Sequence, residues 1–442
     1  MSIVAGNGEG SSNDPKVEVE SGVEASIALE VSSVTNPAHV ELDSLKAWLV
    51  VFGCCGAMTT TFGLTTSFGV FQEYYGRVLL SDQSASSIAW IGGLQYCLLF
   101  FLGLPIGSLN EKGYTRQLVW SGSIIIVCCQ VGISFCSTYH QLLIVQGLLF
   151  GIGSGCVFTP ACAVVQPWFD KKRNLAMGIL ATGSAIGGVI FSLAASNLLP
   201  QIGFAWTARV LALLSLIVLI IASLFVRQYP GLPENRSTSM IGAVTQLKKP
   251  AFSTYILGVF LASASVYAPV NYAQEYGQHL ELPKGATQYL VTIINGTSII
   301  GRIGGGQLAD HFGSIQTETV GVFICGTMCF FWTKCTSSAS LIAYAALYGV
   351  AQGVYVALLP AGAAAIIPSA DLGRSIGVMF SILSIAMLIS QPVFGLLIRD
   401  TSGPAAYSHA AIFGGSVLML SALSLLISIL LRPRTRNMKL EA

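Results

Sequence analysis

Long apolar runs, separated by short polar connectors, follow one another along the chain from residue 47 onward. A helix needs about 20 residues to cross a hydrocarbon layer of about 30 Å, and lipid offers the backbone no hydrogen-bond partner outside a helix or a closed barrel. The pattern therefore predicts an all-α membrane protein of twelve transmembrane helices. The predicted spans are 47–71, 85–106, 118–137, 141–165, 175–198, 206–226, 252–274, 286–304, 318–335, 340–365, 375–397 and 407–431.

The longest connector between apolar runs contains three prolines and separates the first six predicted spans from the last six. A stretch rich in Ser, Gly, Glu and Val, without a helical or strand period, precedes the first span and is typical of a disordered segment. The predicted organisation is a cytoplasmic tail at 1–43, an N-terminal six-helix half at 44–226, a cytoplasmic linker at 227–251, a C-terminal six-helix half at 252–431 and a cytoplasmic tail at 432–442.

Composition agrees with a protein embedded in a lipid bilayer. Of the 442 residues, 53% are hydrophobic and 10% are charged, whereas soluble domains carry about 25% charged residues. A net charge of +2 gives no reason to expect a nucleic-acid partner. The 11 cysteines fall in or beside apolar runs without a C-x-x-C pair, so we expect packing residues and neither a metal nor another cofactor.

Lys and Arg are distributed unequally between the two sides of the predicted bundle. The connectors on the side of the N-terminus carry most of them, whereas the opposite connectors carry only Arg77, Lys284, Lys334 and Arg399. Positively charged connectors stay in the cytoplasm. Both termini are therefore predicted to be cytoplasmic, in a multi-pass protein of the plasma membrane.

A glycine-rich turn appears twice, once in each predicted half. The segment Gly301–Gly313 reads Gly-Arg-Ile-Gly-Gly-Gly-Gln-Leu-Ala-Asp-His-Phe-Gly, and Gly107–Arg116 is a degenerate copy. An acid in such a turn can accept hydrogen bonds from a helix N-terminus and pair with a cation, which would latch one conformation. The alternative is a solvated turn that needs Gly only for its backbone angles. The predicted latch residues are Asp310, Gly306, Gly313, Glu111 and Gly107, with Arg173 and Arg374 as cationic partners.

A second echo supports duplication. Phe158-Thr-Pro-Ala161 in the fourth predicted span resembles Leu359-Pro-Ala361 in the tenth. Many secondary carriers consist of two related halves with the substrate site between them.

Arg302 is the deepest cation in the predicted spans, with Ser298 and Asn295 at i−4 and i−7 on one helix face. A charge in hydrocarbon is costly unless it faces a cavity or a partner. We interpret Arg302 as a candidate ligand for an anionic group of the substrate; the alternative is that it snorkels to the inner interface. Arg209 is a minor candidate and fits an interfacial or pairing role better.

Other polar stripes favour a roomy, semi-polar cavity. One stripe runs along the seventh predicted span and another along the tenth, where aromatic rings and amides recur at helical spacing. Such side chains suit a planar or amphipathic organic molecule; the alternative is ordinary contact between helices. The residues are Tyr267, Asn271 and Gln274, and Tyr344, Tyr348, Gln352 and Tyr355.

These motifs carry a family resemblance. Gly306, Leu308, Ala309, Asp310 and Gly313 match the loop motif of the major facilitator superfamily position for position. The copy that begins at Gly107 matches it loosely, with Leu109, Glu111 and Lys112. The resemblance implies the two-half fold and transport by alternating access.

Four further segments look like the fungal branch of the monocarboxylate porters: 43–48, 67–73, 88–95 and 169–178. That resemblance implies an arginine at the place of Arg302. It would also imply an Asp where this chain has Ser298, and a Lys late in the first span, where the chain offers Thr65, Thr66 and Ser67. Thr66 is kept as a candidate for substrate contact. Either another group titrates, or transport is facilitated diffusion, or the substrate is not a small carboxylate.

No phosphate-binding loop and no cluster of nucleophile, base and acid is present, so neither direct use of ATP nor an enzyme is predicted. We predict a monomeric secondary transporter of a small organic molecule, with a coupling proton left open. The missing Asp and Lys favour export of a fungal secondary metabolite over uptake of a monocarboxylate or related metabolite. A nutrient sensor that binds without net flux is the alternative of another class.

Overall fold

The computed structural model describes residues 42–169, 173–230, 246–367, 372–398 and 404–432, and no residue in these ranges lies in a strand. By its contacts the chain divides into a large unit, Asp43–Tyr229 with Pro233–Ala442, and a small one, Met1–Leu42 with Pro230–Leu232. All helices below belong to the large unit. The predicted tails at 1–43 and 432–442 and the linker at 227–251 lie largely outside the described residues.

The first part of the large unit begins at Ser44, whose side chain accepts a hydrogen bond from the Ala47 N–H and caps the first helix. Its elements are α2 (Leu45–Thr66), α3 (Phe68–Tyr74), the π-helical η1 (Tyr75–Leu79), α4 (Ala85–Phe101), α5 (Gly103–Leu109), η2 (Asn110–Tyr114), α6 (Thr115–Ile133), α7 (Tyr139–Leu142), η3 (Leu143–Leu149), α8 (Phe150–Val165), the 3₁₀ turn η4 (Gln166–Trp168) and α9 (Arg173–Phe225).

Helix α9 is 53 residues long and contains two of the predicted spans. Its backbone leaves the helical region at Gly203, with φ 76° and ψ 174°, three residues after Pro200. A side chain at Gly203 would be strained at this positive φ. Two helical segments therefore meet at Gly203.

The second part of the large unit also consists of helices and helical turns. They are α11 (Pro250–Ser263), α12 (Ala268–His279), α13 (Lys284–Thr287), α14 (Leu290–Phe312), α15 (Ser314–Phe331), η5 (Trp332–Lys334), α16 (Ser338–Ala364), α17 (Leu372–Leu397), η7 (Pro404–Tyr407) and α18 (Ser408–Leu431).

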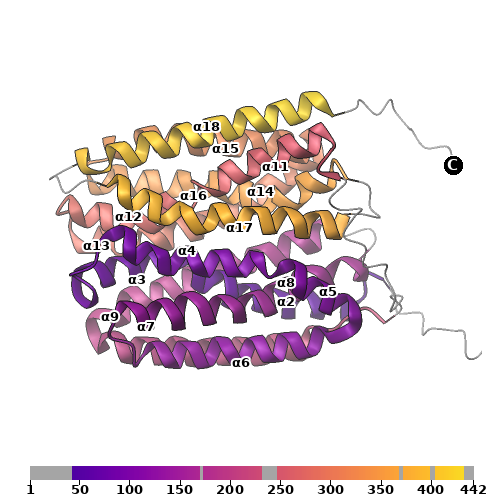
Figure 1. The fold of residues 1–442 in the computed structure, drawn as a ribbon, viewed down its shortest axis with the longest axis horizontal. Coiled ribbons are helices and arrows are strands. Elements are labelled where there is room, and N and C mark those ends of the chain that lie inside the picture. The colour runs from indigo at the N-terminus through magenta and orange to yellow at the C-terminus, as the bar shows by residue number, and fades with distance from the viewer. Residues whose placement is uncertain (1–41, 170–172, 231–245, 368–371, 399–403, 433–442) are drawn as a thin grey trace, which may run out of the picture. The chain divides into compact units, whose positions relative to one another are not determined.

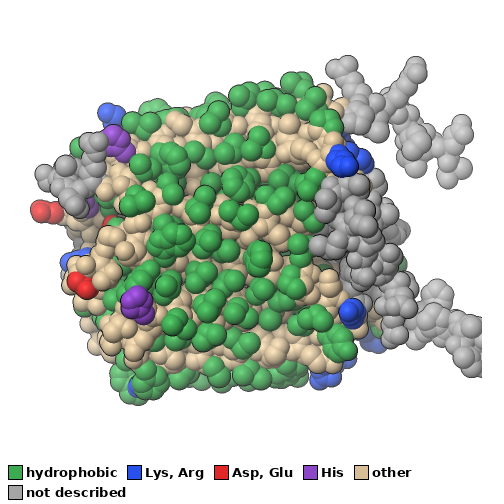
Figure 2. Space-filling view, viewed as in Figure 1, with side chains coloured by type: hydrophobic (Ala, Val, Ile, Leu, Met, Phe, Trp, Pro, Cys, Tyr) green, Lys and Arg blue, Asp and Glu red, His purple; other side chains and the backbone are tan. Residues whose placement is uncertain are grey.

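Ten helices of the described residues are long and apolar enough to cross a membrane, which confirms the predicted all-α membrane class. The two predicted spans in α9 count once among the ten, and α14 is not among them. In Figure 2 hydrophobic side chains cover the middle of the visible face, whereas charged side chains gather at its two ends. Such a belt matches the chemistry of lipid tails.

Four pairs of helices join the two parts of the large unit: α3 with α12, α4 with α17, α5 with α17, and α9 with α14. Figure 1 shows α4 and α17 side by side, where the indigo-to-magenta helices meet the orange-to-yellow helices. Inside each part, α2 packs on α9 and α14 on α16. A Cβ on Gly187 would overlap the carbonyl oxygen of Thr59, so backbones in this bundle approach very closely.

Hydrogen bonds identify which connectors share an end of the bundle. The Asp43 N–H donates to the Trp168 carbonyl at 3.1 Å, and the Trp168 indole N–H donates to the Arg227 carbonyl at 3.1 Å. The Gln228 side chain donates to the Asn110 carbonyl at 3.4 Å. We call this the Trp168 end, and the opposite end, which carries η1, the Arg77 end.

Candidate functional site

A central cavity of about 100 Å³, here the aromatic cavity, lies between the two parts of the large unit. Helices α2, α4, α8 and α9 form one wall, and α16, α17 and Tyr267 form the other. Apolar and aromatic side chains predominate, with Ser184 as a polar exception. The lining residues are Met58, Phe62, Phe100, Phe158, Cys162, Met177, Leu180, Ala181, Ser184, Tyr267, Val356, Ala357, Leu359, Pro360, Phe380 and Met387.

Phe62 is the hub of the rings around this cavity. Its centroid lies 5.9 Å from that of Phe100, 6.0 Å from that of Phe158 and 6.2 Å from that of Tyr267. Phe100 in turn lies 5.1 Å from Phe380 of α17. These are ordinary distances for attractive aromatic pairs, so a planar apolar molecule would meet ring faces and edges from both parts.

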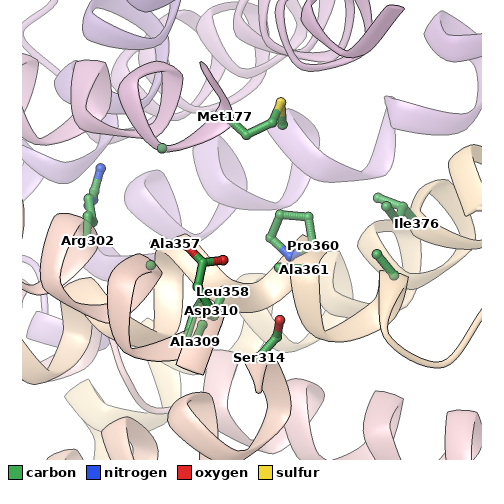
Figure 3. Close-up of a pocket in the computed structure, with 13 residues that line it drawn as sticks. Met177, Arg302, Ala309, Asp310, Ser314, Ala357, Leu358, Pro360, Ala361 and Ile376 are labelled. Atoms are coloured by element: carbon green, nitrogen blue, oxygen red, sulfur yellow. The ribbon is translucent and has the colours of Figure 1, made fainter. Parts of the chain in front are cut away.

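A second cavity of about 260 Å³, here the Asp310 cavity, shares Met177, Ala357 and Pro360 with the aromatic cavity. Figure 3 shows Met177 on one side, with Arg302, Asp310 and Pro360 on the other. Asp310 lies near the C-terminal end of α14. The two cavities therefore form neighbouring compartments with a common wall.

Arg302 of α14 joins the two parts of the large unit beside both cavities. Its guanidinium donates to the Ala181 carbonyl and the Ser184 hydroxyl of α9. The side chain is 4% exposed, and its Nε has no hydrogen-bond partner. Within the described residues no carboxylate forms an ion pair with it. A buried guanidinium with an unused donor and no counter-ion is suited to bind an anion.

Hydrogen bonds between the two parts gather toward the Arg77 end. From α9, the Ser196 hydroxyl donates to the Gln288 carbonyl at 2.9 Å. The Ser86 hydroxyl of α4 donates to the Pro392 carbonyl of α17 at 2.9 Å. A Cβ on Gly69 would lie 2.9 Å from the Asn271 Cα. The two parts are thus joined tightly at the Arg77 end, and the Asp310 cavity lies toward the Trp168 end.

The predicted stripe beside Arg302 is buried and engaged in helix contacts. Ser298 donates to the Asn295 carbonyl at 2.7 Å, and Asn295 donates to the Val291 carbonyl at 3.0 Å. A Cβ on Gly188 of α9 would lie 2.5 Å from Asn295 Cγ. Neither Ser298 nor Asn295 lines the two cavities.

The other predicted substrate residues divide between the cavity and the helix contacts. Tyr267 lines the aromatic cavity, with its ring 4.9 Å from that of Tyr96. The others lie outside both linings. Tyr348 donates to the Val266 carbonyl at 2.8 Å, and the Tyr355 hydroxyl lies 2.7 Å from that of Ser263. Thr66 donates to the Gly63 carbonyl at 3.0 Å. Asn271 is buried with its side-chain amide unpartnered, and Gln352 is buried in α16.

The predicted minor candidate Arg209 has partners at the Arg77 end. Its guanidinium lies 5.2 Å from the ring centroid of Phe135 and 4.8 Å from that of Trp206. Its Nε donates to the Ser134 hydroxyl at 3.3 Å. These contacts explain how a charge is kept there without a substrate.

The two glycine-rich turns share a backbone feature. Gly113 has φ 91° and Gly313 has φ 95°, in a region that favours glycine. Of the predicted latch residues, Asp310 and Gly306 line the Asp310 cavity and Gly107 lies in α5. The side chains of Glu111, Arg173 and Arg374 lie outside the described part of the chain, so the predicted latch pairs stay predictions.

Sequence reasoning missed most of the aromatic wall. Phe62, Phe100, Phe158 and Phe380 look like ordinary core residues of apolar helices. One signal was present: the echoed motifs place Pro160 inside α8 and Pro360 inside α16, and Phe158 and Pro360 both line the aromatic cavity.

Two acidic residues also differ from the sequence-based expectation. The predicted span 252–274 ends one residue before Glu275 and so places this acid in an outer connector, which is wrong. Glu275 lies in α12 and accepts hydrogen bonds from Gln72 at 3.4 Å and Tyr407 at 3.2 Å. Glu318 is the first residue of the predicted span 318–335, but α15 begins four residues earlier, at Ser314, and Glu318 is completely buried.

Comparison with known proteins agrees with this architecture. The family model described as Major Facilitator Superfamily matches residues 47–338. The chain is 34% identical over 376 residues to the MFS transporter asaE of Aspergillus flavus, covering 85% of each chain. It is also 34% identical over 398 residues to the fujikurins efflux protein of Gibberella fujikuroi, covering 89% of this chain and 84% of that protein.

A solved structure shares the fold. It is a bacterial homologue of the human lysosomal transporter Spinster, in an inward-facing and unoccupied conformation. The TM-score is 0.63 at 17% sequence identity, and the match covers 88% of this chain and 97% of that one. The family model and the relatives, together with this helical architecture, show that the chain belongs to the major facilitator superfamily.

Proposed function

We propose that this transporter exports an amphipathic organic metabolite that carries an aromatic or other planar apolar body and an anionic group. The observation that carries the proposal is Arg302, a buried guanidinium with a free donor and no ion pair in the described residues, beside a cavity lined by rings from both halves. The apolar body would lie against Phe62, Phe100 and Phe380, and the anion would meet Arg302. The efflux function in the name of the Gibberella relative favours export.

The proposed transmembrane topology has twelve helices in two six-helix halves. The 53 residues of α9 would measure about 80 Å as one straight helix, far more than a bilayer core of about 30 Å. The break at Gly203 divides it into two pieces that can each span. Helix α14, with 23 residues, would measure about 35 Å and is also long enough. The proposed halves are 44–226 and 252–431, with the linker at 227–251.

For orientation, the proposal places the Trp168 end in the cytoplasm. The described helix ends and connectors at this end carry Lys46, Lys112, Arg116 and Arg227, and cationic segments are retained inside. The Asp310 cavity then faces the cytoplasm, where a compound made by the cell would enter. The proposed location is the plasma membrane, and the proposed functional unit is the monomer.

Alternating access would follow from rocking of the two halves. Contacts at the Arg77 end would open, and the α9 and α14 segments around Arg302 would stay close. In that cycle Asp310 would act as part of a latch at the cytoplasmic end, because it lies in the last turn of α14, just before α15, and lines the cavity. The variant Asp310→Asn is therefore expected to weaken this latch and to leave the affinity for substrate unchanged.

Uptake of a monocarboxylate is the second transport hypothesis, supported by the resemblance of four segments to the monocarboxylate porters. The aromatic cavity favours a larger apolar body than a short-chain acid. A nutrient sensor is the remaining alternative and differs in producing no net flux.

The test is transport by the purified protein in liposomes. Radiolabelled naphthalenesulfonate is a suitable probe because it has a planar body and a permanent negative charge. The expected result is counterflow of this probe, competition by other aromatic anions, and little competition by acetate. Stronger competition by acetate would support the monocarboxylate alternative, and saturable binding without flux would support a sensor. In the host, a deletion strain should retain its own aromatic acidic metabolites inside the cells.

A further inference from the structure

Glu318 is a fully buried acid that the proposed binding site does not use. It lies in α15 with 0% of its surface exposed, and one carboxyl oxygen, Oε1, has no hydrogen-bond partner. No ion pair joins it to Lys, Arg or His within the described residues. An ionised carboxylate in such a place would be very costly, because neither water nor a cation offsets its charge.

The other carboxyl oxygen of Glu318 belongs to a short chain of polar groups. The Tyr255 hydroxyl lies 3.0 Å from Glu318 Oε2 and 2.7 Å from the Leu359 carbonyl oxygen. A hydroxyl has one proton, and the shorter distance favours its donation to the carbonyl. The contact with Glu318 is then satisfied only if the carboxyl is protonated and donates to Tyr255. The hydrogen-bond geometry therefore fits a neutral Glu318.

Few charged or titratable groups surround Glu318. Tyr255 of α11 and Tyr355 of α16 face it. Helix α18, which packs on α15, carries only His409, at the Arg77 end. Neighbouring α14 carries Arg302, Asp310 and His311, none of which forms an ion pair with Glu318. The carboxyl thus has no nearby charge that would fix it in one protonation state throughout a cycle.

The chain of polar groups ends on the wall of the transport cavities. Leu359 and Pro360 line the aromatic cavity, and Pro360 also lines the Asp310 cavity. A Cβ on Gly362 would overlap the Tyr255 hydroxyl and lie 2.6 Å from Glu318 Oε2. Ser314, one turn before Glu318 on the same face of α15, lines the Asp310 cavity. A small movement of α16 at Pro360 would therefore separate Tyr255 from its partners and admit water to the acid.

We propose that Glu318 is the proton-carrying residue of the transport cycle, linked through Tyr255 and Leu359 to the cavity wall. This inference rests on the proposed export function. Binding of the anionic substrate displaces Leu359 and Pro360, and Glu318 gives its proton to water in the Asp310 cavity, leaving a carboxylate. After the halves have rocked and the substrate has left, the carboxylate takes a proton from water on the other side. One proton thus moves inward for each anion exported.

The test uses the full chain in liposomes with naphthalenesulfonate as probe, and compares wild type with Glu318→Gln. Gln keeps the size and the hydrogen bonds of a neutral carboxyl but cannot titrate. Each exchange moves two charges, so the membrane potential is clamped at zero with potassium and valinomycin. A gradient of about one pH unit coupled to one proton should then drive about tenfold accumulation of the probe in the acidic compartment. Glu318→Gln should abolish this accumulation, whereas counterflow without a pH gradient, which needs no net proton movement, should persist.

The outcomes separate this inference from the proposed function. If wild type shows no flux of the probe, the proposed substrate class fails. Two outcomes would overturn the role of Glu318 and leave the proposed substrate class intact. One is wild-type counterflow without accumulation of the probe in a pH gradient, and the other is accumulation that persists in Glu318→Gln. Loss of both activities in a variant of unchanged thermal stability would show that Glu318 is needed for substrate movement itself and not for proton coupling, and would also overturn the proposal.

A second measurement applies if Glu318→Gln fails to fold. Infrared spectra of the wild-type protein at neutral pH should contain a protonated-carboxyl band, and Tyr255→Phe should shift it because the hydroxyl partner is lost. The control is Tyr344→Phe, which removes a buried hydroxyl with no hydrogen-bond partner elsewhere in α16. Absence of the band, or an equal shift in the control, would contradict a neutral Glu318 bound to Tyr255.

Discussion

The guanidinium of Arg302 donates a hydrogen bond to the hydroxyl of Ser184, from α14 in the second part of the large unit to α9 in the first. Ser184 lines the aromatic cavity and Arg302 lines the Asp310 cavity, so this pair stands where the two compartments meet. A substrate anion that approached Arg302 would compete with a neutral hydroxyl for the guanidinium. The guanidinium is charged in both cases, but an anion adds a Coulomb attraction that a neutral hydroxyl lacks, which favours the exchange.

Arg302→Ala should abolish transport of naphthalenesulfonate and leave the protein inserted and folded. A hydrogen bond to a charged group contributes about 1.5–3 kcal/mol, so binding of the probe should weaken roughly tenfold to 100-fold. Binding is measured by isothermal titration of the purified protein, and insertion by thermal stability and yield.

The matched control for Arg302 is Arg209→Ala. Arg209 is the other arginine inside α9 or α14 whose side chain is described, and its partners are Phe135, Trp206 and Ser134. Its loss should leave probe affinity unchanged. Equal losses in the two variants would mean that Arg302 is structural.

Replacement of an aromatic residue in the wall should weaken binding selectively. Phe380→Ala removes a ring from the aromatic cavity, and aromatic pairs contribute about 0.5–1.5 kcal/mol, so affinity for the probe should fall roughly two- to tenfold. Phe394→Ala, in the same helix, removes a buried ring that packs on Phe413 at 5.6 Å instead. Similar probe affinities in these two variants would argue against the aromatic cavity as the binding site.

The glycines of α14 should differ in their tolerance of a methyl group. A Cβ on Gly301 would overlap the carbonyl oxygen of Val350 in α16, whereas one on Gly304 would meet no atom within 4 Å. Overpacking costs about 1–3 kcal/mol. Gly301→Ala should therefore lower the thermal stability of the detergent-solubilised protein, and Gly304→Ala should not. A stability order opposite to this would contradict the close packing of α14 and α16.

The close contact at Gly69 should control the conformational equilibrium. Gly69→Val places a side chain against the Asn271 backbone, where a Cβ alone would lie 2.9 Å from Cα. Closure at the Arg77 end would be hindered, so a cysteine introduced at Ala361 in the Asp310 cavity should react several-fold more slowly with an impermeant maleimide. The background is a variant without the 11 native cysteines.

Gly76→Val provides the comparison for Gly69→Val, because a Cβ there meets only the Ile88 side chain at 3.8 Å. Its labelling rate should equal that of the parent protein. Equal rates for Gly69→Val and Gly76→Val would show that the Arg77 end does not depend on this contact.

Much of the architecture followed from the order of residues alone. Apolar runs of membrane length predicted the helices, because the lipid requires both length and apolar surface of each span independently of its neighbours. The repeated turn predicted a related backbone at its two copies, and Gly113 and Gly313 do share a positive φ. Arg302 could be identified because a single cation within an apolar run is costly unless it faces a cavity or a partner.

Only the tertiary structure decided what these residues face. Periodicity places Tyr348 and Tyr355 on one side of α16, but the packing of α16 against α11 and the segment at Val266 turns their hydroxyls to their own half. Phe62, Phe100 and Phe380 come from three different helices, of which α17 is far from the other two in the chain, and no local sequence pattern encodes their meeting. Glu318 likewise became notable because α11 and α16 close over it. Side-chain exposure, hydrogen-bond partners and cavities depend on residues from distant segments of the chain. Span length and turn geometry depend on residues that are neighbours in the sequence.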